Sequence, residues 1–294
     1  MKKIKLLYAR NIISRKSAQQ ELSFLLLVRN LAFEKTVEVR WAGEDGVWHS
    51  LPAAHHGAID GEQEYWLAKT ALALADDRQL PGNVEFAVRY CVGGGEYWDN
   101  NDGGNHHIQA DSGIMPGADC ALLNVEFDTR LGEQQRLLPV TVAVNSSLGV
   151  RRVSIDWSTD DWRSTQQSNC RYRRNYWDSE FLSNARNPNQ YACQVWQAGL
   201  RVGDAFRVRY RISAETRQHG VLRDDSCGRD YVVERRPLTV MILNLHCCQE
   251  EEQDRKLSRI AQAIDGLGVD IVCLQEGAEL WNEGRGDWQT NTAR

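Results

Sequence analysis

Apolar and polar residues alternate in short segments along residues 22–105, and Gly, Asn and Asp separate these segments. A second series with the same rhythm occupies residues 137–236. Period-two alternation between turn residues is typical of strands that have one face in a core. Many short strands at regular spacing predict a mainly β protein with two immunoglobulin-like antiparallel β-sandwiches in tandem.

The two series resemble each other. Residues 37–48, VEVRWAGEDGVW, match residues 153–162, VSIDWSTDDW, and VEFAVRYCV from Val84 matches AFRVRYRIS from Ala205. Self-similarity over a long period is the mark of a repeated structural unit. We therefore interpret the two series as a duplicated sandwich.

The pattern changes after Pro237. LTVMILNLH predicts a buried strand, the following segment places Leu257, Ile260 and Ile264 on one helical face, and VDIVCLQE predicts another strand. A strand, a helix and a strand in this order predict a βαβ unit with a parallel pair, here a C-terminal fragment of an α/β sandwich.

These patterns divide the chain into five parts. We expect an N-terminal extension at 1–21, the first sandwich at 22–110, a linker at 111–135, the second sandwich at 136–236 and the βαβ segment at 237–294.

Charge narrows the choice of ligand. The 294-residue chain has a net charge of -5, and the ten acidic and five basic residues from Pro237 onward account for all of it. No basic excess is available to neutralise phosphates, which disfavours nucleic acid as a partner of the sandwiches. No apolar run is long enough for a bilayer, so we expect no membrane partner and a cytoplasmic location.

The cysteines and histidines do not indicate a metal site. The eight cysteines include no CxxC pair, and His55, His56, His106 and His107 lack a carboxylate or thiol cluster at a recognisable spacing. We expect reduced thiols and exposed loop histidines.

The residues VRNLAFEKTVEVRWAGEDGVWHS, followed by EFAVRYCVGGGEYWDNNDGGNHHI, resemble the family 21 carbohydrate-binding module. The most specific part is EYWDNNDGGN at 96–105. The resemblance implies a module that binds an α-glucan such as glycogen or starch and needs no cofactor. Glucose has an apolar face and an edge of hydroxyls, which suits flat aromatic side chains beside amides and carboxylates.

By this resemblance, Trp48 and Trp98 are the aromatics of the main sugar site, and Asn100 and Asn105 supply polar contacts. Phe33 matches an aromatic of a second family site. Asp99 is a further candidate contact, although its carboxylate could instead fix the loop by accepting backbone amides.

The sequence also departs from the family pattern. Ala87 replaces a third aromatic of the main site, and His56 and Gln63 stand where the second site would have aromatics. In the second series Trp162 matches Trp48, but Trp98 has no aromatic counterpart. The second sandwich is therefore either structural or a surface for a protein partner.

LTVMILNLH and DIVCLQE resemble the opening strands of the endonuclease/exonuclease/phosphatase superfamily. That resemblance implies a metal-dependent phosphoesterase in which Glu276 binds Mg²⁺ and Asn244 orients phosphate or metal-bound water. The chain stops at Arg294, before the family's remaining catalytic residues, so we expect this chain alone to be inactive.

Two hypotheses follow. In the first, a non-catalytic glucan binder targets an associated phosphoesterase. In the second, the sandwiches are scaffolds or protein-contact modules of a phosphoesterase, and the catalytic activity is the main function.

Overall fold

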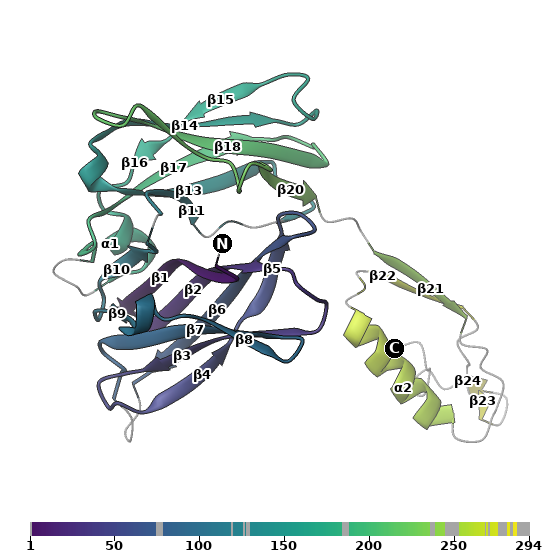
Figure 1. The fold of residues 1–294 in the computed structure, drawn as a ribbon. Coiled ribbons are helices and arrows are strands. Elements are labelled where there is room, and N and C mark those ends of the chain that lie inside the picture. The colour runs from purple at the N-terminus through teal and green to yellow at the C-terminus, as the bar shows by residue number, and fades with distance from the viewer. Residues whose placement is uncertain are drawn as a thin grey trace. The chain divides into compact units, whose positions relative to one another are not determined.

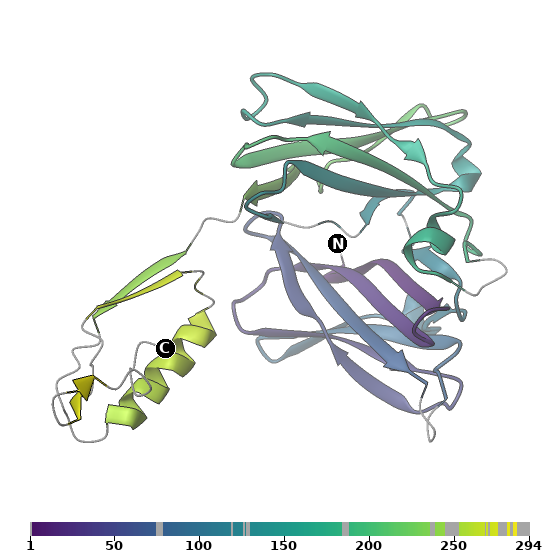
Figure 2. The same ribbon diagram turned by 180° about the vertical axis from the view of Figure 1, so that it is seen from behind.

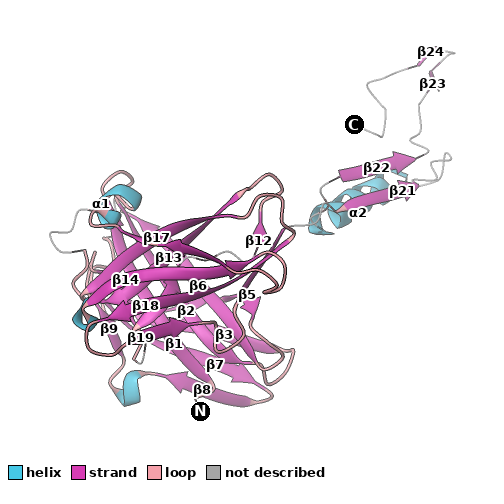
Figure 3. Ribbon diagram, turned by 90° about the horizontal axis from the view of Figure 1, so that it is seen from above, coloured by secondary structure: helices cyan, strands magenta, loops and turns pink. Residues whose placement is uncertain are grey.

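The computed structural model consists mainly of antiparallel strands (Figures 1 and 3). It describes residues 2–74, 79–118, 120–125, 127, 130–183, 188–235, 239–244, 253–267, 269, 271–275, 281–282 and 285–286. The chain forms two compact units, residues 1–235 and 236–294. Two sandwiches make up the first unit, and the predicted fold class is confirmed.

Two sheets form the first sandwich. The inner sheet has the order β10-β1-β2-β6-β5, and the outer sheet has the order β4-β3-β7-β8, with β9 also paired to β7. The strands of the inner sheet are β1 (Ile4–Ser14), β2 (Gln19–Arg29), β5 (Ala54–Ala58), β6 (Gln63–Ala73) and β10 (Gly113–Pro116). Those of the outer sheet are β3 (Lys35–Ala42), β4 (Trp48–Pro52), β7 (Val84–Val92), β8 (Gly95–Asp99) and β9 (His106–Ile108); the short helix η1 is Asn101–Gly103.

The central strands β1 and β2 of the inner sheet are buried on both faces. Phe24 and Leu26 belong to the core shared with the outer sheet, whereas Leu25 and Tyr65 belong to the core of the second sandwich. Strands covered on both faces have near-continuous apolar sequences, which explains the run LSFLLLV in β2. The outer sheet has one buried face and one free face.

The second sandwich repeats the strand pairing of the first. In one sheet β14 pairs with β15 and β18, and β18 pairs with β19 and β20, as β3 pairs with β4 and β7, and β7 with β8 and β9. The other sheet has the order β11-β13-β17-β16. The elements are β11 (Leu122–Val125), β12 (Arg130–Leu131), β13 (Leu137–Asn145), η2 (Ser146–Leu148), β14 (Val150–Ser158), β15 (Gln166–Asn169), β16 (Arg171–Tyr172), α1 (Tyr176–Glu180), β17 (Cys193–Arg201), β18 (Arg207–Thr216), β19 (Val221–Asp224) and β20 (Tyr231–Arg235).

Two predicted boundaries need correction. Residues 1–21 are not an extension, because β1 pairs with β2 and β10 and buries Ile4, Leu6 and Ile12. Residues 111–135 are more than a linker, since they contain β10, β11 and β12. Both errors have one cause. Strand β1 begins the first sandwich and β11 begins the second, and each belongs to its sheet only through pairing with strands that come later in the chain.

The two sandwiches share a polar junction beside their common core. The Tyr65 hydroxyl is 2.9 Å from the Ser226 hydroxyl, and Asp224 accepts the Asn124 amide at 2.9 Å and the Tyr231 hydroxyl at 2.9 Å. Burial raises the pKa of the Asp224 carboxyl to about 6, although these hydrogen bonds act in the opposite direction. Figure 2 shows the second sandwich lying directly against the inner sheet.

The C-terminal unit contains β21 (Val240–Asn244), α2 (Gln253–Leu267) and β22 (Ile271–Gln275), followed by the short pair β23 (Trp281–Asn282) and β24 (Arg285–Gly286). Strands β21 and β22 pair in parallel, with Asn244 opposite Gln275. This is the βαβ unit that the sequence predicts. No helix in the described ranges has the length and apolarity needed to cross a bilayer.

Candidate functional site

The free face of the outer sheet carries alternate residues of its four main strands. Val37, Val39 and Trp41 of β3 are buried in the core, so Glu38 and Arg40 between them point outward. The same alternation in β7 directs Ala87 and Arg89 outward. We call this surface the outer face.

Trp48 and Trp98 both lie on the outer face. Trp48 begins β4 and pairs with Ala42, whereas Trp98 on β8 pairs with Arg89. Each indole is 43% exposed. The structure therefore places the two predicted platforms on one surface, open to solvent.

The two indoles lie at opposite edges of the sheet and in different rows. Trp48 is level with Ala42, whereas Trp98 is level with Glu38 through Arg89. Three strand spacings and four residues along a strand separate their Cα positions, which corresponds to about 20 Å. Ala87 belongs to the intervening row on β7. Trp48 and Trp98 therefore project from two separate backbone positions at opposite edges of the outer face.

Trp98 is held by a chain of polar contacts that the sequence did not indicate. Its indole N–H donates to Glu96 Oε1 at 2.6 Å, and the Arg89 guanidinium lies 5.8 Å from the ring centre. Arg89 donates to Glu96 at 3.2 Å and to Glu38 at 2.9 Å, and Glu38 also accepts the Ser50 hydroxyl. Burial opposes ionisation of Glu38, but these donors hold its pKa below the usual range.

The loop after β8 positions the two asparagines. Asn100 caps η1 and accepts the Gly103 amide at 3.1 Å. Asn105 has a φ of 53° and donates through its side-chain amide to Glu85 at 2.6 Å. Glu85 is level with Ala42 and thus with Trp48 on the outer face. Asn105 is therefore near the row that contains Trp48, whereas the Asn100 side-chain oxygen is engaged in holding its own loop.

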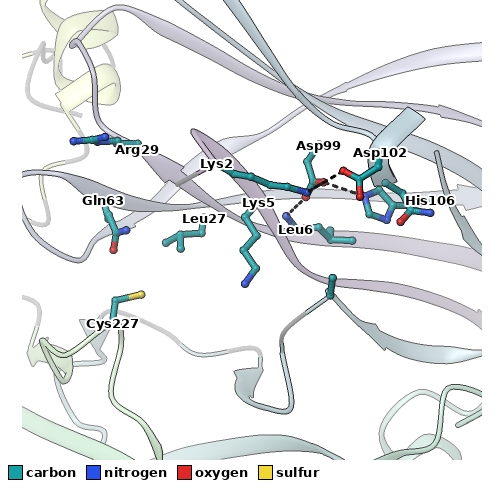
Figure 4. Close-up of a pocket in the computed structure, with 12 residues that line it drawn as sticks. Lys2, Lys5, Leu6, Leu27, Arg29, Gln63, Asp99, Asp102, His106 and Cys227 are labelled. Carbon is teal, nitrogen blue, oxygen red and sulfur yellow. Dashed lines mark hydrogen bonds and ion pairs between the residues drawn. The ribbon is translucent and has the colours of Figure 1, made fainter. Parts of the chain in front are cut away.

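Asp99 faces the opposite way, and the structure corrects its candidate role as a sugar contact. It is 5% exposed and pairs in register with the core residue Val88. As Figure 4 shows, its carboxylate meets the Leu6 amide at 2.8 Å, Lys2 at 3.3 Å and His106 at 3.5 Å. Burial opposes its ionisation, but these three partners hold its pKa well below the usual range. Asp99 joins β8 to β1, in line with the alternative that it fixes the loop.

His106 is likewise not an exposed loop histidine. Its ring lies 5.1 Å from the Phe86 ring, and its side chain is 12% exposed. The hollow beside Lys2, Asp99 and His106 has a volume of about 440 Å³ (Figure 4). It belongs to the inner side of β8 and does not reach the outer face.

Phe33 lies away from Trp48. It is 97% exposed in the loop before β3. Trp48 is level with Ala42 at the other end of β3, so Phe33 is displaced along the strand by more than about 20 Å. His56, at a position where the second family site would have an aromatic, instead contacts the Phe127 carbonyl at 2.8 Å in the junction. The structure leaves Phe33 as an isolated aromatic.

Trp162 of the second sandwich is held in a different environment from Trp48. Its indole N–H donates to Asp230 at 2.8 Å, and the Arg211 guanidinium lies 4.5 Å over its ring. Arg209 and Arg211 both pair with the same Asp230 carboxylate. These contacts use the N–H and one face of the ring, so Trp162 is held against the Arg211 and Asp230 side chains of its own sandwich.

Only one of the two predicted metal ligands can be placed. Asn244 is exposed at the end of β21, opposite Gln275, and Glu276 lies outside the described residues. In the described parts of the chain no group of three or more His, Cys, Asp or Glu side chains is arranged to hold a metal ion.

Residues 5–109 match the model of the carbohydrate/starch-binding module (family 21). This segment is a family 21 carbohydrate-binding module. The match begins within β1, as the fold does, and ends just beyond β9. The family 21 module thus includes residues that the predicted boundary at Leu22 left out.

Curated relatives are similar over a segment shorter than the module. Protein phosphatase 1 regulatory subunit 3A of Mus musculus is 33% identical over 84 residues, which are 28% of this chain and 8% of that protein. Regulatory subunit 3E of Mus musculus is 38% identical over 84 residues, 28% of each protein. The chain therefore spans only a small part of the length of these relatives.

Among solved structures, the starch-binding domain of Rhizopus oryzae glucoamylase, in complex with β-cyclodextrin and maltoheptaose, is similar at 24% identity. The match covers 37% of this chain and 95% of that domain, with a TM-score of 0.30. The carbohydrate-binding module of the muscle glycogen-targeting subunit of protein phosphatase 1 is also 24% identical, with a TM-score of 0.27. That match covers 37% of this chain and 77% of that one.

Proposed function

We propose that the family 21 module binds the α-glucan of glycogen or starch on its outer face. The observation that carries this proposal is the placement of Trp48 and Trp98, each 43% exposed, on one face of one sheet. An exposed indole offers a flat apolar surface for the C–H face of a glucose ring. Glu85 and Asn105 beside the Trp48 row provide acceptors and donors for hydroxyls.

Because the two tryptophans are separated, we expect the ligand to be a glucan chain. Because the Cα positions of Trp48 and Trp98 lie about 20 Å apart across the sheet, a single glucose contacts one of the rings, while a polymer contacts both. Simultaneous contact raises the overall affinity through effective concentration. Ala87 between them supplies no aromatic surface, so we expect weaker binding than a face with a continuous aromatic row would give.

Affinity electrophoresis in glycogen-containing gels tests the proposal. The intact chain is compared with Trp48→Ala, Trp98→Ala and the double variant. Loss of a tryptophan that anchors a ligand typically costs about 2 kcal/mol, so each single variant should bind clearly more weakly and the double variant should migrate as in a glycogen-free gel. Phe206→Ala is the matched control, because Phe206 is 58% exposed in the second sandwich.

Unchanged retardation of the double variant would reject the outer face as the glucan site. Equal loss in the Phe206→Ala control would show that any exposed aromatic contributes and would also reject it.

We also propose that the module targets an associated phosphoesterase to the glucan. The parallel pair β21 and β22, with Asn244 at the carboxyl end of β21, supports the resemblance of the C-terminal unit to a phosphoesterase opening. Ligands of open α/β sheets bind at this edge. A longer polypeptide that also carries the family's remaining catalytic residues should release phosphate from a phosphoester. More of this activity should sediment with glycogen when Trp48 and Trp98 are present than when both are replaced by Ala.

A further inference from the structure

We propose that Arg89 is a positioning residue that fixes the Trp98 platform through Glu96. This inference rests on the proposed function, because it concerns how one of the two platforms presents its face to the glucan. Arg89 lies directly beside Trp98 in the antiparallel pair of β7 and β8. Arg89 thus affects the ligand only by holding the neighbouring Trp98 ring.

The contacts form a closed unit. Glu96 is bound at both oxygens: Oε1 accepts the Trp98 indole N–H at 2.6 Å, and Oε2 accepts Arg89 Nη2 at 3.2 Å. The Arg89 guanidinium also lies 5.8 Å from the centre of the Trp98 ring. The indole is therefore held at its N–H and contacted by a cation, which leaves few other rotamers favourable.

Arg89 is anchored in turn from the opposite side. Its Nη1 donates to Glu38 Oε1 at 2.9 Å, and Glu38 also accepts the Ser50 hydroxyl from β4. The chain of contacts thus crosses β4, β3, β7 and β8. Because four strands of the sheet support it, the guanidinium has a fixed position from which to hold Glu96.

An unrestrained exposed indole would lose its rotamer freedom when it stacks on sugar. Ordering a side chain of this kind at a binding surface costs affinity, and preorganisation removes that cost. Removing Arg89 should therefore weaken glycogen binding by about three- to tenfold. Because the effect passes through the Trp98 ring, it should vanish when that ring is absent.

A double-mutant cycle on the full chain tests this inference. Arg89→Ala, Trp98→Ala and the double variant are measured by affinity electrophoresis in glycogen gels. We expect Arg89→Ala to weaken binding in the wild-type background and to have no further effect in the Trp98→Ala background. Arg136→Ala is the control, since it breaks another exposed arginine–carboxylate pair, with Asp204, in the second sandwich.

A second readout reports the ring itself. The fluorescence anisotropy contributed by Trp98, taken as the difference between proteins with Trp98 and with Trp98→Ala, should fall when Arg89 is replaced. A general loss of folding would instead change the other tryptophans and the melting temperature.

An equal loss of affinity from Arg89→Ala in both backgrounds would overturn the inference, because Arg89 would then contact the sugar directly. If Arg89→Ala bound glycogen with full affinity while Trp98→Ala bound more weakly, the inference would also be overturned, but the proposed function would stand. Unchanged binding of Trp98→Ala would also overturn the inference, and unchanged binding of the variant with both Trp48→Ala and Trp98→Ala would overturn the proposed function as well.

Discussion

Replacing Asp224 by Asn should change the free energy of unfolding by an amount that depends on pH. Compared with wild type, the variant should gain stability as the pH rises from acidic to neutral. Asp224 is half-buried as a residue, and its carboxylate is enclosed by Tyr231, the Asn124 amide and the Ser226 amide at the junction of the sandwiches. Burial raises its pKa to about 6, above the ordinary value for aspartate. Asn keeps one acceptor oxygen at this position and cannot ionise.

The direction follows from proton linkage. Below about pH 4 the carboxyl is protonated in the folded and unfolded chain alike. Between about pH 4 and about pH 6 the unfolded chain releases this proton while the folded chain keeps it, so the stability of the wild type falls as pH rises. Above about pH 6 both states are ionised and the loss stays constant.

The magnitude follows from the same two pKa values. The free energy of unfolding of Asp224→Asn minus that of wild type should increase by about 2 kcal/mol between pH 4.5 and pH 7.5. Urea denaturation across this range measures it. For Asp160→Asn the difference should stay constant, because hydrogen bonds from Ser164 lower the Asp160 pKa to about 2 and place its linkage below this range. A difference for Asp224→Asn that does not change with pH would refute the reasoning.

Two further changes test the corrected fold. Deletion of residues 2–14 removes β1, which pairs with both β2 and β10, so the first sandwich should not fold; a native circular dichroism spectrum and melting temperature of the deleted chain would contradict this. Trp162→Phe should lower the free energy of unfolding by about 2 kcal/mol through loss of the hydrogen bond to Asp230, as measured in urea, without changing retardation in glycogen gels; weaker retardation would instead indicate a sugar site on the second sandwich.

The sequence by itself determined the strand rhythm and the class of fold. Alternation in segments such as VEFAVRYCV defined which residues of β7 face the core, and the turn residues marked where strands end. It also indicated the exposed aromatics, because Trp48 and Trp98 lie beside Gly, Asp and Asn at strand ends. These properties depend on neighbours in the chain, which is why they can be predicted from local pattern.

Only the tertiary structure decided which strands complete each sheet. Strand β1 has the period of many other strands, and nothing local shows that its partners are β2 and β10. The same limit applied to Asp99, whose inward direction depends on its register opposite Val88 and on Leu6 from a distant strand.

The distance between the platforms is also a tertiary property. It results from the number of strands between Trp48 and Trp98 and from the register of each pair. The contacts of Arg89 with Glu38 and Glu96 depend on the same registers. Pairing between strands far apart in sequence fixes these positions, and the residue types alone do not encode them.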